Sequence, residues 1–505
     1  MKFSGRTLFL PFFGLLSLAV LLAAALFTGC EQPGGGLPPP SVTIAGAGEL
    51  AKIGADPAYP LNGNYTLAAD VTLSGWKPVG TTAAPFTGTF DGGGHSVTIT
   101  GFDAAAVQAG SCAGLFGYVR NGTVQDLSLS GTMNVSRGAA LFAGGVAGRL
   151  ENARLADIVS SMAVDAESTG GPVYAGGLAG YGWNLTVARC TVTGAVSVRS
   201  RGHNSSAGGV AGYLSRSALS DCRAEGDVRL EAGAAGDPAD EAYLYMIYAG
   251  GLAGYAGDGS RIERSAAAGD VYAKAPYPYA GGLAGYTYGA VSGAVEGSVV
   301  DACHALGDVT AAAIKNGLPY AGGLAGYTSQ GAVLKDSYAE GDVKAVTDSK
   351  TAWAGGAAGA CAAGGVIYRC YARGGVLAEA GANGLASSQP GAGDGALAGG
   401  IAGYVYFGAD TRVEGCAALN ARLEATGGGS PGVHRIAGRT GAGSPKILNN
   451  AGSTAISGYI TAPADAGLDG ADCADPPAQA AYQDLGWDFT SVWKTGGGYP
   501  ALQWE

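Results

Sequence analysis

One segment, residues 428–432, matches the G-x-S-x-G pattern of hydrolase nucleophiles, with Ser430 at its centre. In such hydrolases the backbone N–H of the residue after the serine donates a hydrogen bond to the oxyanion. Here that residue is Pro431, and proline has no backbone N–H. The match therefore does not predict a serine nucleophile.

Other catalytic patterns are missing from the sequence. No two of the four histidines are four residues apart, so the H-E-x-x-H zinc motif is absent. No glycine directly precedes a lysine, which excludes a P-loop, and the dinucleotide-like turn at residues 46–51 has no βαβ pattern around it. We expect a protein that is not an enzyme and that uses no cofactor.

Aspartates recur after glycine, at Asp227, Asp270, Asp308 and Asp342. Aspartate side chains commonly accept hydrogen bonds from nearby backbone in turns, and this is the role we predict. A stack of carboxylates would alternatively suit Ca²⁺. The repeat has no second acidic position to complete a ligand set, so no metal site is expected.

Cysteines also recur at one position of a repeat, where serine sometimes replaces them: Cys190, Cys222, Ser265, Cys303, Ser337, Cys370 and Cys416. Exchange of Cys with Ser indicates a small buried slot. Zinc ligands come in closely spaced pairs, unlike these. Eight cysteines besides Cys30 would permit disulfides in an oxidising compartment, and the sequence leaves free and bonded thiols open.

The N-terminus has the layout of a secretory signal. Lys2 and Arg6 precede an apolar stretch over residues 8–27, and Gly29-Cys30 ends it like a bacterial lipobox. We predict a signal peptide over 1–29, lipidation of Cys30, a Pro- and Gly-rich tether over 30–40 and an extracytoplasmic, membrane-anchored protein, with the outer membrane or cell surface favoured. The alternative is an uncleaved anchor, since about 20 apolar residues can span a bilayer.

Composition and charge narrow the function further. The net charge is −11, and removal of residues 1–29 takes away two bases and leaves 27 basic and 40 acidic residues, or −13. Nucleic-acid binding needs clustered Lys and Arg, so nucleic acid is not an expected partner. With 91 glycines, the chain is also poorly suited to helices.

A repeat dominates the chain. Blocks of the form A-G-G-[hydrophobic]-A-G-Y start with glycines at positions 114, 145, 177, 209, 251, 282, 323, 356 and 400. The intervals are 31 to 33 residues, with three longer ones of 41 to 44. Each block is followed by short alternating runs bounded by glycine, a pattern typical of strands. Such units bury their apolar faces only by stacking.

The predicted fold is therefore all-β: a right-handed parallel β-helix of about 10–11 coils with caps at both ends. N-terminal coils are expected over 41–113, the repeat over 114–440 and a C-terminal cap over 441–505 that contains Trp487, Trp493 and Trp504. The cap should cover the last coil, because exposed strand edges promote aggregation.

The Gly-Leu-Ala-Gly blocks, such as Gly251–Gly254, resemble GLUG-motif repeats of bacterial surface proteins. Residues 76–80, 85–95 and the final 499–504 are similar to the beginning and end of such domains. The resemblance implies an adhesin-like β-helix at a cell surface. A shared fold does not by itself imply a shared function.

Two aromatic ladders are predicted because equivalent residues of stacked coils lie about 4.8 Å apart. The first contains the candidate binding residues Tyr181, Tyr213, Tyr255, Tyr286 and Tyr327, with Arg149 and Ala360 as interruptions. The second comprises Phe142, Tyr174, Tyr248, Tyr279, Tyr320 and Trp353. These rings could form a covered structural stack or an exposed strip for sugars, and the glycines obscure which ladder points outward.

We expect a non-catalytic scaffold for binding or adhesion, with a glycan or a host or cell-surface protein as partner. A self-associating envelope protein and a polysaccharide-degrading enzyme are the alternatives. The insertions near 231–241, 291–299 and 379–396 are predicted to carry recognition, because loops on a rigid scaffold vary without disturbing the core.

Overall fold

The computed structural model describes residues 40–103, 105–107, 111–233, 245–289, 297–314, 317–381, 395–459, 467–475, 477–495 and 498–505. The chain divides into Met1–Pro39 and Pro40–Glu505, and the second unit contains all described residues. The predicted signal peptide, Cys30 and nearly all of the tether lie outside them. Within the described part, no helix is long and apolar enough to cross a membrane.

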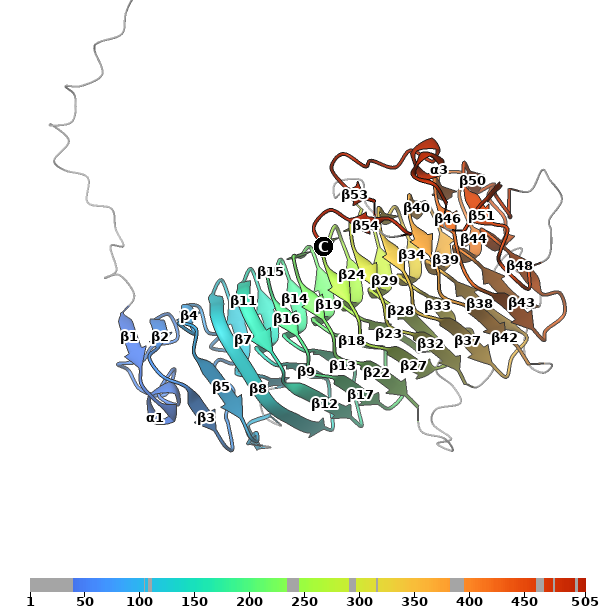
Figure 1. Cartoon of the computed structure of the whole chain (residues 1–505). Coiled ribbons are helices and arrows are strands. Elements are labelled where there is room, and N and C mark those ends of the chain that lie inside the picture. Colours follow the sequence, from blue (N-terminus) through green and yellow to red (C-terminus); the bar gives the residue numbers. More distant parts are fainter. Residues whose placement is uncertain are drawn as a thin grey trace, which may run out of the picture. The chain divides into compact units, whose positions relative to one another are not determined.

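One coil shows how the fold is built. The chain passes through β19 (Ala211–Ser215), β20 (Ala218–Ser220), β21 (Arg223–Ala224), β22 (Val228–Ala232) and β23 (Met246–Gly250), and then β24 (Ala253–Gly257) begins the next coil. Each strand pairs in parallel with its equivalent one coil later, so that Tyr213 lies beside Tyr255. The predicted parallel β-helix is confirmed (Figure 1).

Two ten-stranded sheets form two walls of the stack. The first sheet contains β19, β24 and β7 (Phe116–Arg120), β10 (Ala147–Glu151), β14 (Ala179–Trp183), β29 (Ala284–Tyr288), β34 (Ala325–Ser329), β39 (Ala358–Ala362), β44 (Ala402–Tyr406) and β49 (Ala437–Thr440). The second contains β23 and β6 (Cys112–Ala113), β9 (Leu141–Gly144), β13 (Val173–Gly176), β18 (Ser205–Gly208), β28 (Tyr277–Gly281), β33 (Tyr320–Gly322), β38 (Thr351–Gly355), β43 (Gly395–Gly399) and β48 (Gly432–His434). The tenth strand of the first sheet, β49, is preceded by Arg435 where the other blocks have their leading glycine, which is why the repeat pattern counted nine blocks.

The third sheet has 32 strands and forms the remaining walls. Besides β20 to β22, its repeat strands are β8 (Thr123–Arg137), β11 (Arg154–Ser160), β12 (Ala163–Ser168), β15 (Thr186–Ala188), β16 (Thr191–Val192), β17 (Val196–Ser200), β25 (Arg261–Glu263), β26 (Ala266–Ala267), β27 (Val271–Ala275), β30 (Val299–Asp301), β31 (His304–Ala305), β32 (Val309–Ala313), β35 (Val333–Lys335), β36 (Tyr338–Ala339), β37 (Val343–Thr347), β40 (Val366–Tyr368), β41 (Tyr371–Ala372), β42 (Val376–Glu379), β45 (Arg412–Glu414), β46 (Ala417–Ala418), β47 (Leu423–Thr426), β50 (Lys446–Leu448), β51 (Ala451–Ser453) and β52 (Ala471–Cys473).

The N-terminal coils are irregular. They contribute β1 (Ser41–Ile44), β2 (Asn64–Leu67), β3 (Val71–Leu73), β4 (Thr89–Asp91) and β5 (Ser96–Ile99) to the third sheet. The short helix α1 (Ala47–Leu50) lies at this end and buries Leu50 (Figure 1).

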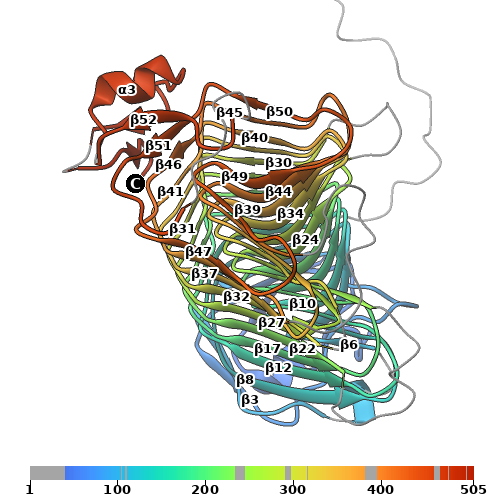
Figure 2. The same cartoon turned by 90° about the vertical axis from the view of Figure 1, so that its right-hand side faces the viewer.

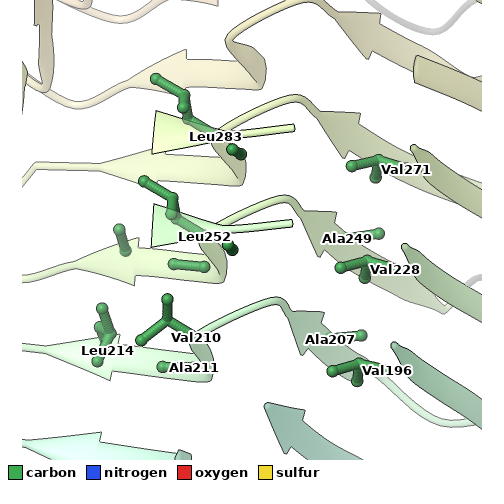
Figure 3. Close-up of a cluster of buried hydrophobic side chains, with 14 of the residues drawn as sticks. Val196, Ala207, Val210, Ala211, Leu214, Val228, Ala249, Leu252, Val271 and Leu283 are labelled. Carbon is green, nitrogen blue, oxygen red and sulfur yellow. The ribbon is translucent and has the colours of Figure 1, made fainter. Parts of the chain in front are cut away.

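The core is a continuous apolar stack. Val196, Val228 and Val271 occupy the same rung of successive coils and are almost fully buried (Figure 3). Leu252 and Leu283, at the start of β24 and β29, are likewise buried. Burial of each such side chain contributes about 1.5–3 kcal/mol, and no coil could bury these faces alone.

Residues 477–505 form what we call the C-terminal strap, with α3 (Gln479–Asp484), β53 (Trp493–Lys494) and β54 (Ala501–Leu502). The coils end with β50 to β52, but the strap runs back along the outside of the third sheet (Figure 2). The indole of Trp487 donates to the carbonyl of Gly415 at 2.7 Å, and that of Trp504 to Ala302 at 2.7 Å. The sequence predicted cover for the end of the stack, whereas the strap covers a flank as far back as β31.

Candidate binding surface

Five tyrosines predicted as a ladder lie on equivalent rungs of β14, β19, β24, β29 and β34. The rings of Tyr181 and Tyr213 stack with centroids 5.1 Å apart, and those of Tyr213 and Tyr255 at 4.4 Å. Farther along, the pairs of Tyr286 with Tyr255 and with Tyr327 are T-shaped, at 5.6 and 5.1 Å. All five tyrosines are half-buried.

The second predicted ladder lies beside the first on the outside of the same corner. Tyr248 contacts Tyr255 with ring centroids 5.7 Å apart, and Tyr320 contacts Tyr327 at 5.4 Å. We call the interlocked ladders the aromatic seam: Phe142, Tyr174, Tyr181, Tyr213, Tyr248, Tyr255, Tyr279, Tyr286, Tyr320, Tyr327 and Trp353. Each ring pair contributes about 0.5–1.5 kcal/mol beyond its buried area.

The Gly pairs make this corner possible. A Cβ placed on Gly250 would collide with the carbonyl oxygen of Ala253, and one on Gly251 with that of Gly282. Only glycine allows the chain to fold back so closely here. The tight corner brings the residue before the Gly pair, such as Tyr248, next to the residue after it, such as Tyr255.

The two interruptions of the first ladder are bridged by other contacts. Arg149 places its guanidinium 5.2 Å from the ring centroid of Tyr118 and 5.6 Å from that of Tyr181, and also pairs with Glu151. At Ala360 no ring is present, but the hydroxyls of Tyr327 and Tyr406 lie 2.7 Å apart across the gap. The seam therefore continues past both positions.

Exposure varies along the seam. Trp353 is fully buried, and so are its ring neighbours Tyr404 and Tyr406. Tyr279 and Tyr320 are buried as well. The neighbouring rings of Tyr248, Tyr255 and Tyr286 are partly exposed, and Met246 beside them is 40% exposed. We call this open region the aromatic patch: Met246, Tyr248, Tyr255, Tyr277, Tyr286 and Tyr288.

Contacts within the aromatic patch make it one continuous surface. The Tyr248 hydroxyl lies 3.6 Å from the Met246 sulfur, and Met246 is the strand neighbour of Tyr277. The ring of Tyr288 lies 6.2 Å from Tyr255 and 5.7 Å from Tyr286. The aromatic patch thus spans at least two coils and includes residues of the first and the second sheet.

The hydroxyls of Tyr248, Tyr255 and Tyr286 stay protonated far above neutral pH, because burial raises the pKa of each. Burial raises the pKa of Tyr286 to about 12, and a hydrogen bond with Ser329 partly offsets this rise. The hydroxyl oxygens of Tyr286 and Ser329 are 2.8 Å apart. Burial also raises the pKa of Tyr255, helped by Tyr213 and Asp258. Tyr255 and Tyr286 therefore present neutral phenol groups.

The predicted insertions largely fall on residues 234–244, 290–296 and 382–394, outside the described part of the chain. The described residues that flank two of these segments adjoin the aromatic patch in the chain: Tyr245 directly precedes Met246, and Gly289 directly follows Tyr288. That the insertions carry recognition stays a prediction.

The recurring aspartates have a structural role. Their Oδ1 atoms accept hydrogen bonds from backbone N–H groups of the next coil: Asp270 donates to Asp227 at 2.9 Å, Asp308 to Asp270 at 2.8 Å and Asp342 to Asp308 at 2.8 Å. The predicted bonding to local backbone is therefore wrong, because these carboxylates bond the equivalent aspartate of the next coil, 34 to 43 residues away in the chain. No group of three or more metal-ligating side chains occurs among the residues that the structure describes.

The structure also contains a charge ladder that the sequence did not reveal. Arg189 pairs with Asp157, Arg264 with Asp221 and Arg369 with Asp336, each through two hydrogen bonds of 2.6–2.9 Å. All six residues have positive φ and occupy the same turn of the third sheet. Their partners are 32, 43 and 33 residues apart, so only the coil register brings them together.

The remaining sequence candidates do not form a catalytic constellation in the described coils. Ser430 is exposed in the loop between β47 and β48, and its carbonyl accepts a hydrogen bond from Arg439. A hollow of about 620 Å³ lies at the N-terminal end, lined largely by backbone and apolar groups such as Ile53, Leu73 and Trp76. The cysteines of the predicted slot are buried and free.

Comparison with known proteins supports the repeat assignment. Residues 247–272 match the GLUG motif. The match covers most of one coil, from β23 into β27, and includes Tyr248 and Tyr255. Because parallel pairing places the neighbouring coils in register with this one, they are its structural equivalents.

No curated protein sequence matches the chain. Among solved structures, a match covers 92% of this chain and 92% of the other, with 14% sequence identity and a TM-score of 0.27. It is the 1.30 Å crystal structure of a "putative immunoglobulin A1 protease" from Bacteroides ovatus.

Proposed function

We propose that this GLUG-repeat β-helix is a non-catalytic binding scaffold at the outer face of a bacterial membrane, anchored through a lipid on Cys30. The aromatic patch is its contact surface. The observation that carries the proposal is the cluster of five partly exposed tyrosines and the exposed Met246 on closely stacked coils. Tyrosine and methionine are enriched in protein interfaces, and tyrosine in their energetic centres.

The geometry favours a protein partner at a cell surface. A sugar ring packs on the face of an aromatic ring, but the faces of Tyr181, Tyr213 and Tyr255 are largely occupied by one another. What the patch offers is ring edges, hydroxyls and a methionine side chain, which suit an irregular polypeptide surface. A glycan partner is the competing outcome.

The charged groups of the coils support a non-catalytic role. Arg189 with Asp157 and Lys335 with Asp301 are paired between neighbouring coils, where they hold the stack together. Catalytic carboxylates and bases would instead converge on one cleft with shifted pKa values.

The test uses the Cys30→Ser chain, secreted in soluble form, against glycan arrays and intact cell-surface protein extracts. Tyr255→Ala should weaken binding at least about 10-fold, as expected for an interface hot spot. Tyr272→Ala is the matched control, since Tyr272 is a half-exposed tyrosine of the same coils on the third sheet. Equal loss in both variants, or turnover of a polysaccharide, would contradict the proposal.

The anchor is tested separately by fractionation. Wild-type protein should remain with membranes, and Cys30→Ser should appear in the soluble fraction or fail to mature. If Cys30→Ser still fractionates with membranes, the apolar N-terminus is an uncleaved anchor and the lipid assignment is wrong.

A further inference from the structure

Two cysteines of the buried slot are neighbours on adjacent coils. Cys190 precedes β16 and Cys222 precedes β21, and these strands pair in parallel with Thr191 beside Arg223. The backbone N–H of Arg223 donates to the carbonyl of Cys190 at 2.9 Å. Adjacent parallel strands are about 4.8 Å apart, which lies within the Cα separation of about 4.4–6.8 Å that disulfides require.

The two side chains also influence each other in the folded protein. The neighbouring Cys222 thiol lowers the pKa of Cys190 despite its burial, while the Cys222 thiol itself donates to the carbonyl of Ser220 at 3.2 Å. Both side chains are almost fully buried, so reaction with an external reagent must precede closure of these coils.

We propose that Cys190 and Cys222 form a disulfide that joins two coils when the protein folds in an oxidising compartment. The Cys190 thiolate attacks a low-molecular-weight disulfide such as oxidised glutathione, releasing one reduced glutathione and forming a mixed disulfide. The Cys222 thiolate then displaces the second glutathione, and each thiol gives up its proton to solvent. The protein loses two hydrogens, and one glutathione disulfide becomes two thiols.

Cys303 provides an internal control in the same slot. Its rung neighbours are Ser265 and Ser337, whose hydroxyls accept backbone hydrogen bonds from Cys222 at 3.1 Å and from Cys303 at 3.0 Å. It therefore has no cysteine on either adjacent rung and should remain a thiol. Cys370 and Cys416 also lie on adjacent rungs, but burial raises the pKa of both of these thiols. The proposal rests on the adjacent rungs of Cys190 and Cys222, and the lowered pKa of Cys190 supports the choice of this pair.

The test is peptide mapping of the full chain after secretion into an oxidising compartment. The protein is denatured with excess alkylating agent, without reductant, and digested with trypsin, which separates Cys190 in peptide 190–199 from Cys222 in peptide 217–223. The expected product is the two peptides linked, 2 Da lighter than their sum, while Cys303 is alkylated. Alkylation of both Cys190 and Cys222 in most molecules would overturn the proposal.

Two cysteine variants and a refolding experiment test the assignment of the disulfide further. Cys303→Ser should leave the linked peptide unchanged, whereas Cys190→Ser should leave Cys222 alkylated. Refolding the reduced chain with oxidised and reduced glutathione should restore the linked peptide and raise the thermal midpoint above that of the Cys190→Ser variant. This in-vitro arm supplies the oxidant directly, so its failure would count against the pairing and not against the proposed cell-surface location. Linkage of Cys222 to Cys303 instead would also contradict the assignment.

Discussion

The solenoid carries stacked aromatic rungs on two flanks, and they are treated differently. On the third sheet, His304, Tyr338 and Tyr371 stack with centroids 5.0 and 4.8 Å apart, and the C-terminal strap covers them. At the corner between the first and second sheets, the residues of the aromatic patch stay partly exposed. Stacked rings are thus covered by the strap on one flank and remain accessible at the patch on the other, which is why we assign binding to the aromatic patch.

The largest expected effect comes from removing a buried aromatic ring from the flank that the C-terminal strap covers. Trp493 is fully buried in the strap, against Trp487 at 4.5 Å and Tyr371 at 5.9 Å between ring centroids. Trp493→Ala should lower the free energy of unfolding by about 3–5 kcal/mol. Tyr255→Ala, on the open flank, should cost about 2 kcal/mol, because its ring is only half-buried. Denaturant unfolding of both variants checks this, and equal losses would mean that the two flanks do not differ.

The next comparison is between two Asp–Arg pairs that occupy the same turn in different coils. Asp336 and Arg369, beside the strap, have side chains 2% and 20% exposed, whereas Asp157 and Arg189 are 45% and 55% exposed. Asp336→Asn should destabilise by at least about 2 kcal/mol, because it leaves a largely buried guanidinium unpaired. Asp157→Asn should cause no resolvable change, since exposed pairs are screened by solvent and salt.

Asparagine tolerates the positive φ of both aspartate positions, 49° at Asp336 and 56° at Asp157, so backbone strain is matched between the variants. Denaturant unfolding at low and high salt is the measurement. A large loss at Asp157, or none at Asp336, would show that the strap does not set the strength of this ladder.

The smallest effect concerns ionisation of the seam. The pKa of Tyr286 is raised from 10.0 to about 12, chiefly by burial. Between these values the unfolded chain loses the phenolic proton while the folded chain keeps it, so stability is complete below pH 10 and falls as the pH rises to about 12. Absorbance titration at high pH should show one fewer late-titrating tyrosine in Tyr286→Phe. An unchanged titration curve would mean that the Tyr286 ring is more solvated than its packing indicates.

Much of the fold follows from the repeat alone. Constant spacing of 31 to 33 residues places Tyr213 over Tyr181 and Val228 over Val196, because a parallel stack repeats every coil. The buried cysteine slot follows from the exchange of Cys303 with Ser265 and Ser337 by the same reasoning. The pairing of Asp336 with Arg369 could also have been found by reading the residue before each Cys or Ser. Asp221 and Arg264 stand there in successive units, as do Asp336 and Arg369, with Ala302 between the two pairs.

The direction in which the rings point could not be read from the sequence. Strand parity assigns inward and outward positions only while the backbone stays regular, and the corner at Gly250 and Gly251 interrupts it. Both ladders in fact point outward and interlock. The path of the strap was equally hidden, because its anchors, such as Trp504 on Ala302, join residues 202 positions apart.

The amino-acid sequence by itself therefore determined the parallel stack, its register and the residues on each rung, since all three follow from local spacing repeated many times. Only the tertiary structure decided which rungs are exposed. Exposure depends on how closely the glycine corner brings together the strands that carry Tyr248 and Tyr255. It also depends on which apolar surface the C-terminal strap packs against. Both are set by packing between residues that no repeat period relates.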